Sequence, residues 1–364
     1  MLLAVYYLLV IIAIGGTILP RFNDQHWFFR VWDFGKVQLT ILQTILFVIA
    51  LIFLEFKTPL SIAFTICLVV CIIYNTTILI RYTTLYKVRR PAAYSKRSKS
   101  ISLLSVNVYQ FNSEYQRLID LVRKIKPDIF LTMESNKDWE NALNVLDSEF
   151  KHSRKIAQEN TYGMHFYTNL EVSDIKTNYF VADDLPSVET ILHTKDGYEF
   201  VFFGVHPPPP SPTEEETSKE RDGELMCISK EVRKLDKTVV VAGDFNNVAW
   251  ARTSLLFKRT SDMLDPRIGR GFVSTFHADY WFLRFPIDLF FHTKDVYIEE
   301  FKTLEHVGSD HLPLYCKFYI GDKASEPDTV DEFDKEQPGD LEEAEELIKE
   351  GKKEQSNRPI VAKP

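Results

Sequence analysis

The sequence predicts an α/β protein, in which a layered α/β sandwich over residues 101–321 follows a membrane region of three transmembrane helices over residues 1–88. Two observations predict this architecture. Three uncharged apolar runs occupy most of the first 80 residues. From residue 101 onward, short apolar and β-branched runs alternate with helical patterns, as they do in layered α/β domains.

The three apolar runs, residues 2–19, 37–54 and 59–80, contain no charged residue. Each approaches or reaches the roughly 18–20 residues that a helix needs to cross a bilayer. A signal peptide is the alternative for the first run, but that run lacks a basic n-region and a clear small-residue cleavage site. We therefore expect a multi-pass protein of the cell membrane, with the lipid bilayer as a partner.

The basic residues near these runs predict an orientation. Arg21, Arg30 and Lys36 lie between the first and second runs, whereas only Lys57 lies between the second and third. Seven more follow the third run, most of them in a basic linker at residues 89–100. The positive-inside rule then places the N-terminus outside and the large domain in the cytoplasm. The linker would attract anionic lipid headgroups, and nucleic-acid binding is its alternative interpretation.

Within the sandwich, residues 101–109 predict a strand, residues 113–126 a helix that Pro127 ends, and residues 128–133 a buried strand. Further strands are expected at residues 163–168, 188–193, 199–206, 238–243, 287–292 and 311–319, and a further helix at residues 215–235. The pattern therefore supports sheets covered by helices.

Residues 322–364 form an acidic tail, with 14 acidic and 7 basic residues in a chain of net charge −8. We expect this tail to be disordered, apart from a short helix at residues 341–349. The other 321 residues sum to about −1, and no obvious basic stripe occurs in the sandwich, which argues against the basic surface that is typical of a duplex-DNA-binding protein.

Polar side chains stand at the ends of six apolar strands or next to them. They are Asn107 in SVNVYQFN, Glu134 in FLTMESN, His206 in GVHPPPP, Asp244 and Asn246 in AGDFNN, Asp288 in PIDLFF, and Asp310 and His311 in GSDHLP. A single such residue is usually a turn or a helix cap. Six in this order indicate one site, because ligands of α/β proteins bind at the carboxyl ends of the strands.

The residue types indicate the chemistry of that site. Carboxylate and amide oxygens are the ligands preferred by Mg²⁺ or Mn²⁺. Histidines are suited to stabilising a phosphate and to transferring protons. Cysteine and histidine residues at zinc-site spacing are absent from the sequence.

These blocks, GDFN and SDH above all, resemble the endonuclease/exonuclease/phosphatase superfamily over residues 101–320. The VHPPPP block and the apolar N-terminus are most similar to its bacterial membrane-attached members. The resemblance implies a four-layer α/β/β/α sandwich of two packed mixed β-sheets, and a hydrolase acting on phosphoester bonds. Some membrane-attached members carry their domain outside the cell, so the side of the membrane stays open.

The resemblance also implies roles for single residues. Asn107, Glu134 and Asp310 would hold the metal, with Glu134 as the principal ligand. Asp244 would orient or deprotonate the attacking water.

The remaining residues would act on the phosphate. Asn246 would contact it, and His206 would contact it or assist the leaving group. His311 would stabilise the pentacoordinate phosphorus or act as an acid or base, with its ring oriented by Asp288. Glu189 is a candidate carboxylate partner of His206.

Three functions are compatible with the sequence. The first is a membrane-anchored, metal-dependent phosphoesterase acting on a phosphate ester or pyrophosphate of a lipid or small molecule. The second is a metal-dependent nuclease, which the lack of an obvious basic stripe in the sandwich disfavours. The third is a catalytically silent membrane scaffold, which the presence of Glu134, Asp244 and His311 disfavours. The sequence does not set the oligomeric state.

Overall fold

The computed structural model describes residues 1–54, 56, 58–88, 98–321 and 335–354. Most of the expected basic linker and parts of the acidic tail lie outside these residues. The helices are α1 (Leu2–Ile18), α2 (Trp27–Phe34), α3 (Lys36–Phe53), α4 (Pro59–Leu79), α5 (Tyr115–Ile125), α6 (Lys137–Leu143), α7 (Lys219–Lys234), α8 (Arg252–Thr260) and α9 (Asp340–Gly351), with the short 3-10 turns η1 (Leu19–Arg21), η2 (Ile80–Tyr82), η3 (Asn144–Leu146) and η4 (Trp281–Leu283).

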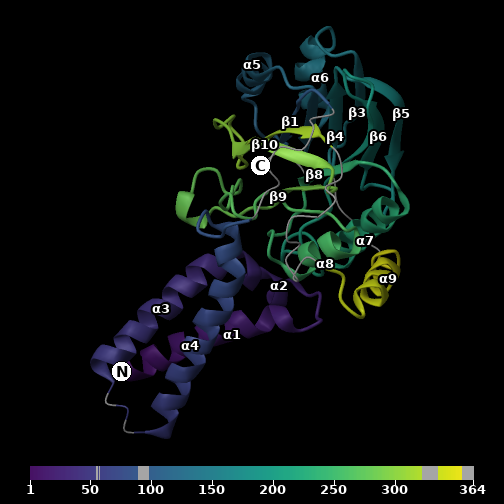
Figure 1. Cartoon of the computed structure of the whole chain (residues 1–364). Helices are drawn as coiled ribbons and strands as arrows, with labels where there is room; N and C mark the ends of the chain where they lie inside the picture. The colour runs from purple at the N-terminus through teal and green to yellow at the C-terminus, as the bar shows by residue number, and fades with distance from the viewer. Residues whose placement is uncertain (55, 57, 89–97, 322–334, 355–364) are drawn as a thin grey trace.

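The strands form two packed mixed sheets, which confirms the predicted fold class (Figure 1). The first sheet has the order β10-β11-β1-β2-β4-β3, and the second has the order β5-β6-β7-β8-β9. Their bounds are β1 (Ile101–Asn107), β2 (Ile129–Met133), β3 (His152–Ile156), β4 (Met164–Thr168), β5 (Glu171–Asn178), β6 (Ser187–His193), β7 (Glu199–Val205), β8 (Val239–Asp244), β9 (Asp288–His292), β10 (Val296–Thr303) and β11 (Leu314–Ile320).

The central strands carry apolar side chains on both faces, which is why four layers form. In β8, Val240 faces the core between the sheets, while its neighbour Val241 faces a second core under α7 and α8. In β1, Leu103 faces the core between the sheets, and Leu104 faces a third core under α5 and α6. Because successive side chains of a strand point to opposite faces, each central strand contributes to two cores.

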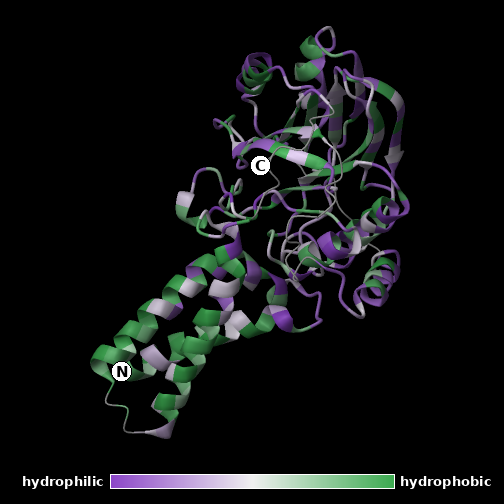
Figure 2. Ribbon diagram, in the orientation of Figure 1, coloured by the Kyte–Doolittle hydropathy of each residue, from purple (hydrophilic) through white to green (hydrophobic). Residues whose placement is uncertain are grey.

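Helices α1, α3 and α4 are long and apolar enough to cross a membrane, as predicted, and they pack together as a bundle (Figures 1 and 2). Their shared interior contains a polar cluster. The Gln43 amide donates to the Thr17 hydroxyl at 2.8 Å, and the Asn75 amide donates to Thr17 and Gln43 at 3.0 and 3.2 Å. Such bonds favour one helix arrangement, since lipid offers these groups no other partner.

The N-terminal segment that contains the three apolar helices is hydrogen-bonded directly to the sandwich. The bonds run from Trp27 N to Glu216 O (3.0 Å), Ser218 N to Gln25 O (2.8 Å), Trp250 Nε1 to Asp33 O (2.8 Å), Tyr82 Oη to Ala249 O (3.0 Å) and Gly269 N to Arg81 O (2.8 Å). On the sandwich side, these groups belong to the segments that follow β7 and β8 and precede β9. The end of the second sheet at which β7 and β8 finish and β9 starts therefore rests on this N-terminal segment.

The short helix expected at residues 341–349 of the tail is present as α9 (Asp340–Gly351), but it is packed on the sandwich. This acidic helix packs beside α7 and α8, where its Ala344 and Ile348 join the apolar core (Figure 1). Arg259 of α8 donates two hydrogen bonds of 2.7 and 2.8 Å to the Asp340 carboxylate, and Arg252 donates to Glu343 at 2.8 Å. Acidic residues of α9 thus pair with basic residues of the sandwich instead of facing solvent.

We expect the Asp340→Ala substitution to destabilise the protein by about 1–3 kcal/mol, because Arg259 would lose both charge-assisted bonds. Thermal unfolding of the solubilised full-length protein measures this effect. Glu346→Ala is the matched control, since Glu346 lies on the exposed face of the same helix. Equal melting temperatures for the two variants would contradict a structural role for α9.

Candidate active site

The candidate side chains meet at one end of the two sheets because of the directions of the strands. β1 and β2 are parallel, with Asn107 opposite Met133, so Asn107 and Glu134 leave the first sheet together. β8 and β9 are antiparallel, with Asp244 directly opposite Asp288. An antiparallel strand begins beside the end of its neighbour. Asp288 therefore lies at the same end of the sheet as Asp244, although it is the first residue of β9.

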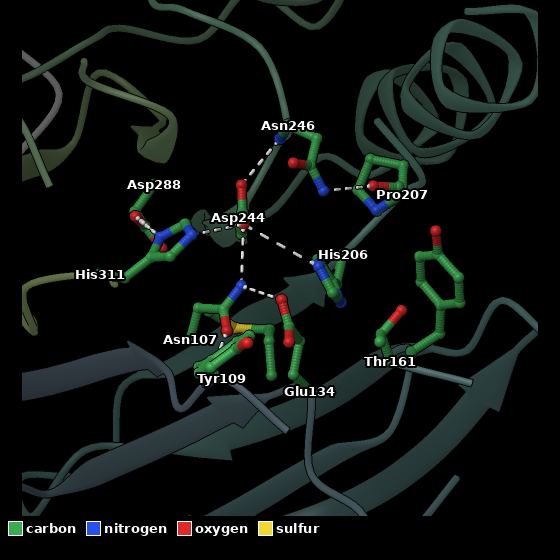
Figure 3. A network of polar contacts seen from close by, with 12 residues as sticks. Asn107, Tyr109, Glu134, Thr161, His206, Pro207, Asp244, Asn246, Asp288 and His311 are labelled. Carbon is green, nitrogen blue, oxygen red and sulfur yellow. Dashed lines mark hydrogen bonds and ion pairs between the residues drawn. The ribbon is translucent and has the colours of Figure 1, made fainter. Parts of the chain in front are cut away.

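Asp244 lies at the centre of the resulting network (Figure 3). Its Oδ2 accepts a hydrogen bond from Asn107 Nδ2 at 3.0 Å, and its Oδ1 accepts one from the Asn246 backbone N–H at 2.8 Å. The same Asn107 amide donates to Glu134 Oε1 at 2.9 Å. Asn107 therefore bridges a carboxylate of each sheet.

Three residues around this network have positive φ values, which residues other than glycine rarely adopt. Tyr109, Glu134 and Asn246 have φ values of 55°, 61° and 48°. The turns are tied by side-chain bonds, since the Tyr109 N–H donates to Asn107 Oδ1 at 3.0 Å and the Gln110 N–H donates to Glu134 Oε2 at 3.1 Å. Left-handed residues of this kind concentrate at functional sites, where the surrounding structure holds them.

His311 and Asp288 form a buried pair. His311 Nδ1 lies 2.7 Å from Asp288 Oδ2, and His311 Nε2 lies 3.6 Å from Asp244 Oδ2. The Ser309 hydroxyl accepts a bond from the His311 N–H at 3.0 Å and donates to Asn107 O at 2.8 Å, so the histidine is fixed to β1. Behind the pair, the fully buried Arg267 donates to the Asp288 carbonyl.

The two histidines of the site have opposite charge preferences. Burial disfavours a charged imidazole, but the carboxylates of Asp288 and Asp244 outweigh this effect and raise the pKa of His311 to about 10. Burial, together with the charge of His311, lowers the pKa of His206 to about 3. At neutral pH, His311 is therefore a cation and His206 is a neutral imidazole.

The carboxylates of the site are shifted by burial. Burial and the nearby charge of Asp310 raise the pKa of Glu134 to about 7. Burial likewise raises the pKa of Asp244 to about 7, although the His311 cation opposes this effect. Two buried carboxylates that resist ionisation suit a bound cation, which would favour their charged forms.

The carboxylate oxygens of Glu134 and Asp310 suit a hard divalent cation, whereas Asn107 presents its amide nitrogen to Glu134 and its oxygen accepts the Tyr109 N–H. Asp244, Asp288 and His311 also bring one ligand atom each to within 4.8 Å of one another. However, a protonated imidazole has no free lone pair for a metal. Metal binding by His311 would therefore require the loss of its proton.

The structure gathers the predicted residues Asn107, Glu134, Asp244, Asn246, Asp288, His206 and His311 in this network, with Asp310 beside it. His206 Nε2 lies 3.9 Å from Asp244 Oδ2 (Figure 3). Glu189 is not part of the network. It lies opposite Phe203 in the sheet and accepts a bond from Asn178 at 2.8 Å, while His206 Nδ1 has no hydrogen-bond partner in the described chain.

Sequence reasoning missed two buried residues of the site. Arg267 supports Asp288, and the Tyr162 ring lies 5.4 Å from the His206 ring. Both lie in irregular segments between strands, and neither belongs to the blocks at strand ends. Only the folded chain brings them to the site.

A divalent cation should raise the melting temperature more at about pH 8 than at about pH 5. The folded pKa values of Glu134 and Asp244 lie above their unfolded values, so the metal-free protein loses stability as pH rises toward about 7. A cation binds the ionised forms and restores that loss. Thermal unfolding with Mg²⁺, Mn²⁺ or EDTA measures the effect, and Glu134→Gln is the control. Equal stabilisation at both pH values, or in Glu134→Gln, would contradict this assignment.

Solved structures share this architecture at low sequence identity. TDP2 of D. rerio complexed with a single-strand DNA product is 15% identical, with a TM-score of 0.52, and the match covers 61% of this chain and 100% of that one. The human Nocturnin catalytic domain with bound sulfate is 14% identical, with a TM-score of 0.51 and coverages of 63% and 97%. An endonuclease/exonuclease/phosphatase from Bacteroides vulgatus is 16% identical, with a TM-score of 0.50 and coverages of 61% and 100%.

A sequence comparison with curated proteins gave no match. The model of the endonuclease/exonuclease/phosphatase family matches residues 104–311, which is more than half of the chain. That segment runs from β1 to His311 and contains every residue of the network described above. Enzymes of this family are hydrolases that act on phosphoester bonds and use divalent metals. The chain belongs to the endonuclease/exonuclease/phosphatase family.

Proposed function

We propose that this chain is a membrane-anchored, divalent-metal-dependent phosphoesterase that hydrolyses a phosphate ester or pyrophosphate of a lipid or small molecule. The observation that carries the proposal is the buried Asp244 carboxylate. It stands within 4 Å of two histidines of opposite charge preference, and the Asn107 amide links it to Glu134. Phosphoester hydrolysis needs a carboxylate that accepts a proton, a positively charged group that stabilises the phosphate, and a neutral hydrogen-bond donor.

Glu134 and Asp310 are the proposed holders of the cation, either Mg²⁺ or Mn²⁺, and Asn107 would join them once its side-chain amide turns its oxygen toward Glu134. When bound, the cation would neutralise charge on the phosphate and on the leaving oxygen. Glu134 is suited to the main ligand position because, among the described residues, its second oxygen accepts a single backbone bond, from Gln110 at 3.1 Å.

Asp244 is the proposed acceptor of the proton from the attacking water. Its backbone partner Asn246 and its side-chain partner Asn107 hold the carboxylate in one orientation. A pKa near neutrality suits a general base, because the group then exchanges protons readily at the working pH. His311 would face the phosphate as a cation, kept protonated and oriented by Asp288.

His206 is the proposed neutral contact to the phosphate or to the leaving group. Its Nε2, which lies 3.9 Å from Asp244 Oδ2, faces the site, whereas its buried Nδ1 has no hydrogen-bond partner among the described residues. The Asn246 amide donates to Pro207 O at 2.9 Å, which holds the loop after His206 close to Asp244. Asn246 would thereby position His206 as well as contact the phosphate.

A nuclease is the second candidate, since TDP2 of D. rerio, which shares the fold, was solved with a single-strand DNA product. Nucleic-acid binding usually needs many phosphate contacts from Lys and Arg, whereas residues 101–321 of this chain contain 34 acidic and 25 basic residues. The position of the site above three apolar helices favours a substrate at the membrane. A silent scaffold remains the outcome if no activity is found.

We expect Asp244→Asn to lower the turnover rate by about 10²–10⁴-fold with little change in folding, because the buried site loses its proton acceptor but keeps its shape. The full-length protein is assayed with a lipid phosphate, a lipid pyrophosphate, a chromogenic diester, a sugar phosphate, and single- and double-stranded DNA. Each substrate is tested with Mg²⁺, Mn²⁺ or EDTA.

Two variants complete that experiment. Glu134→Ala should abolish the metal-dependent rate, whereas Glu189→Gln, on the same sheet but outside the site, should keep it. Asp244→Asn activity above about a tenth of the wild-type rate would contradict the proposed base. Preferred cleavage of DNA would favour the nuclease. Absence of both turnover and metal binding would favour the scaffold.

Asp288→Asn should move the basic limb of the pH–rate profile to lower pH by about one unit or more. The substitution removes the carboxylate that keeps His311 protonated, so the His311 imidazole loses its proton at a lower pH. The measurement is kcat against pH for the wild type and the variant. An unchanged basic limb would show that the His311 cation is not needed for turnover.

A further inference from the structure

An exposed aromatic cluster in the sandwich has no part in the chemistry above. It is the tip formed by residues 280–283, around the turn η4, and we call it the aromatic tip. Tyr280 is 51% exposed, Trp281 81%, Phe282 53% and Leu283 43%. Single exposed apolar residues are ordinary, but four in succession at one loop end mark a surface that contacts something apolar.

The aromatic tip is held by an ordered loop. At its base, Thr275 N and Phe276 N donate to Phe285 O at 3.0 and 3.1 Å, which closes the two arms against each other. Arg284 donates from Nε to His277 O at 3.3 Å. The loop therefore presents the four side chains in a defined position.

The base of this loop belongs to the candidate active site. The Phe276 ring centroid lies 4.9 Å from that of His311. The Ala278 N–H donates to the Asp310 carbonyl at 2.6 Å. Only one residue separates Ala278 from Tyr280, so the aromatic tip begins within about 7 Å of chain from the rim of the site.

The far end of the loop lies against the start of a membrane-spanning helix. Gln38, in the first turn of α3, donates to Phe282 O at 2.6 Å. The Phe34 ring centroid, at the end of α2, lies 5.9 Å from that of Phe285. In Figure 1, the green loop that contains η4 stands just above the upper end of α3. Since the apolar run of α3 begins at Val37, the aromatic tip lies at the level where that helix enters the bilayer.

We propose that the aromatic tip sits in the interfacial layer of the bilayer and seats the rim of the active site on the membrane surface. Tryptophan and tyrosine favour this layer because their rings are partly apolar and partly polar. A phosphate ester anchored in the same leaflet could then place its headgroup in the site while its chains stay among the lipids. This part of the inference rests on the proposed function.

The first test uses Trp281 as its own probe. The full-length protein is placed in phosphatidylcholine vesicles that carry bromine near the top of the acyl chains, and tryptophan quenching is compared between wild type and Trp281→Phe. The other four tryptophans, Trp27, Trp32, Trp139 and Trp250, are common to both proteins. We expect wild type to lose the larger fraction of its emission.

A control variant adds Tyr198→Trp to Trp281→Phe. Tyr198 is exposed in the turn between β6 and β7, at the opposite edge of the sheet from His206. This new tryptophan should escape the brominated lipid. Equal fractional quenching of wild type and Trp281→Phe would overturn the proposal. So would shielding of Trp281 from both the lipid quencher and an aqueous quencher, since a protein partner would then cover it.

The second test measures catalysis on two forms of one phosphate ester. The double variant Trp281→Ala/Phe282→Ala should lower kcat/KM at least about tenfold for a long-chain ester in vesicles, because two interfacial aromatic contacts are lost. For a short-chain, water-soluble ester the same variant should keep the wild-type value, and Tyr198→Ala should keep it for both.

An equal loss on both esters would place the aromatic tip in the chemistry and overturn the proposal. No loss on the vesicle ester would overturn it too. Absence of turnover by the wild type on either ester would count against the proposed function alone, because the quenching experiment needs no activity.

Discussion

The buried carboxylate of Asp244 is the group on which the rest of the site depends. It ends a central strand of one sheet and accepts a hydrogen bond from Asn107, which ends a central strand of the other. This contact joins the two sheets at the end where Glu134, Asp288 and His311 also emerge. Because the carboxylate is removed from water, its charge is governed by its neighbours, and those neighbours are the proposed catalytic groups.

The same end of the second sheet rests on the segment of the three apolar helices, so the position of the candidate active site relative to those helices follows from the fold. Arg30, Lys36 and Arg81, which predicted the orientation, are all buried at or near this contact. Lys36 forms an ion pair with Asp33 at 3.1 Å, and Arg30 donates to Pro20 O at 3.3 Å. Some of the basic residues counted by the positive-inside rule are therefore buried in contacts within the protein. For this reason, their number is a poorer guide to the side of the membrane.

Sequence reasoning located the central strands and the polar residues that end them. Strands such as β2 and β8 are apolar on both faces, and a single acid after such a run is conspicuous. It did not locate β3, β5 and β10, which are edge or solvent-facing strands with mixed polarity. Their pairing depends on a neighbour far along the chain, which local patterns do not reveal.

The sequence by itself determined the three apolar helices, the α/β alternation and the residue types of the site, because these depend on local apolar period and on motifs. The tertiary structure decided what each charge does. It made His311 a cation and His206 neutral, left Glu189 outside the site, and packed the acidic α9 on basic residues. These outcomes depend on burial and on partners distant in the chain, since the free energy of a charge is set by its surroundings rather than by its neighbours in sequence.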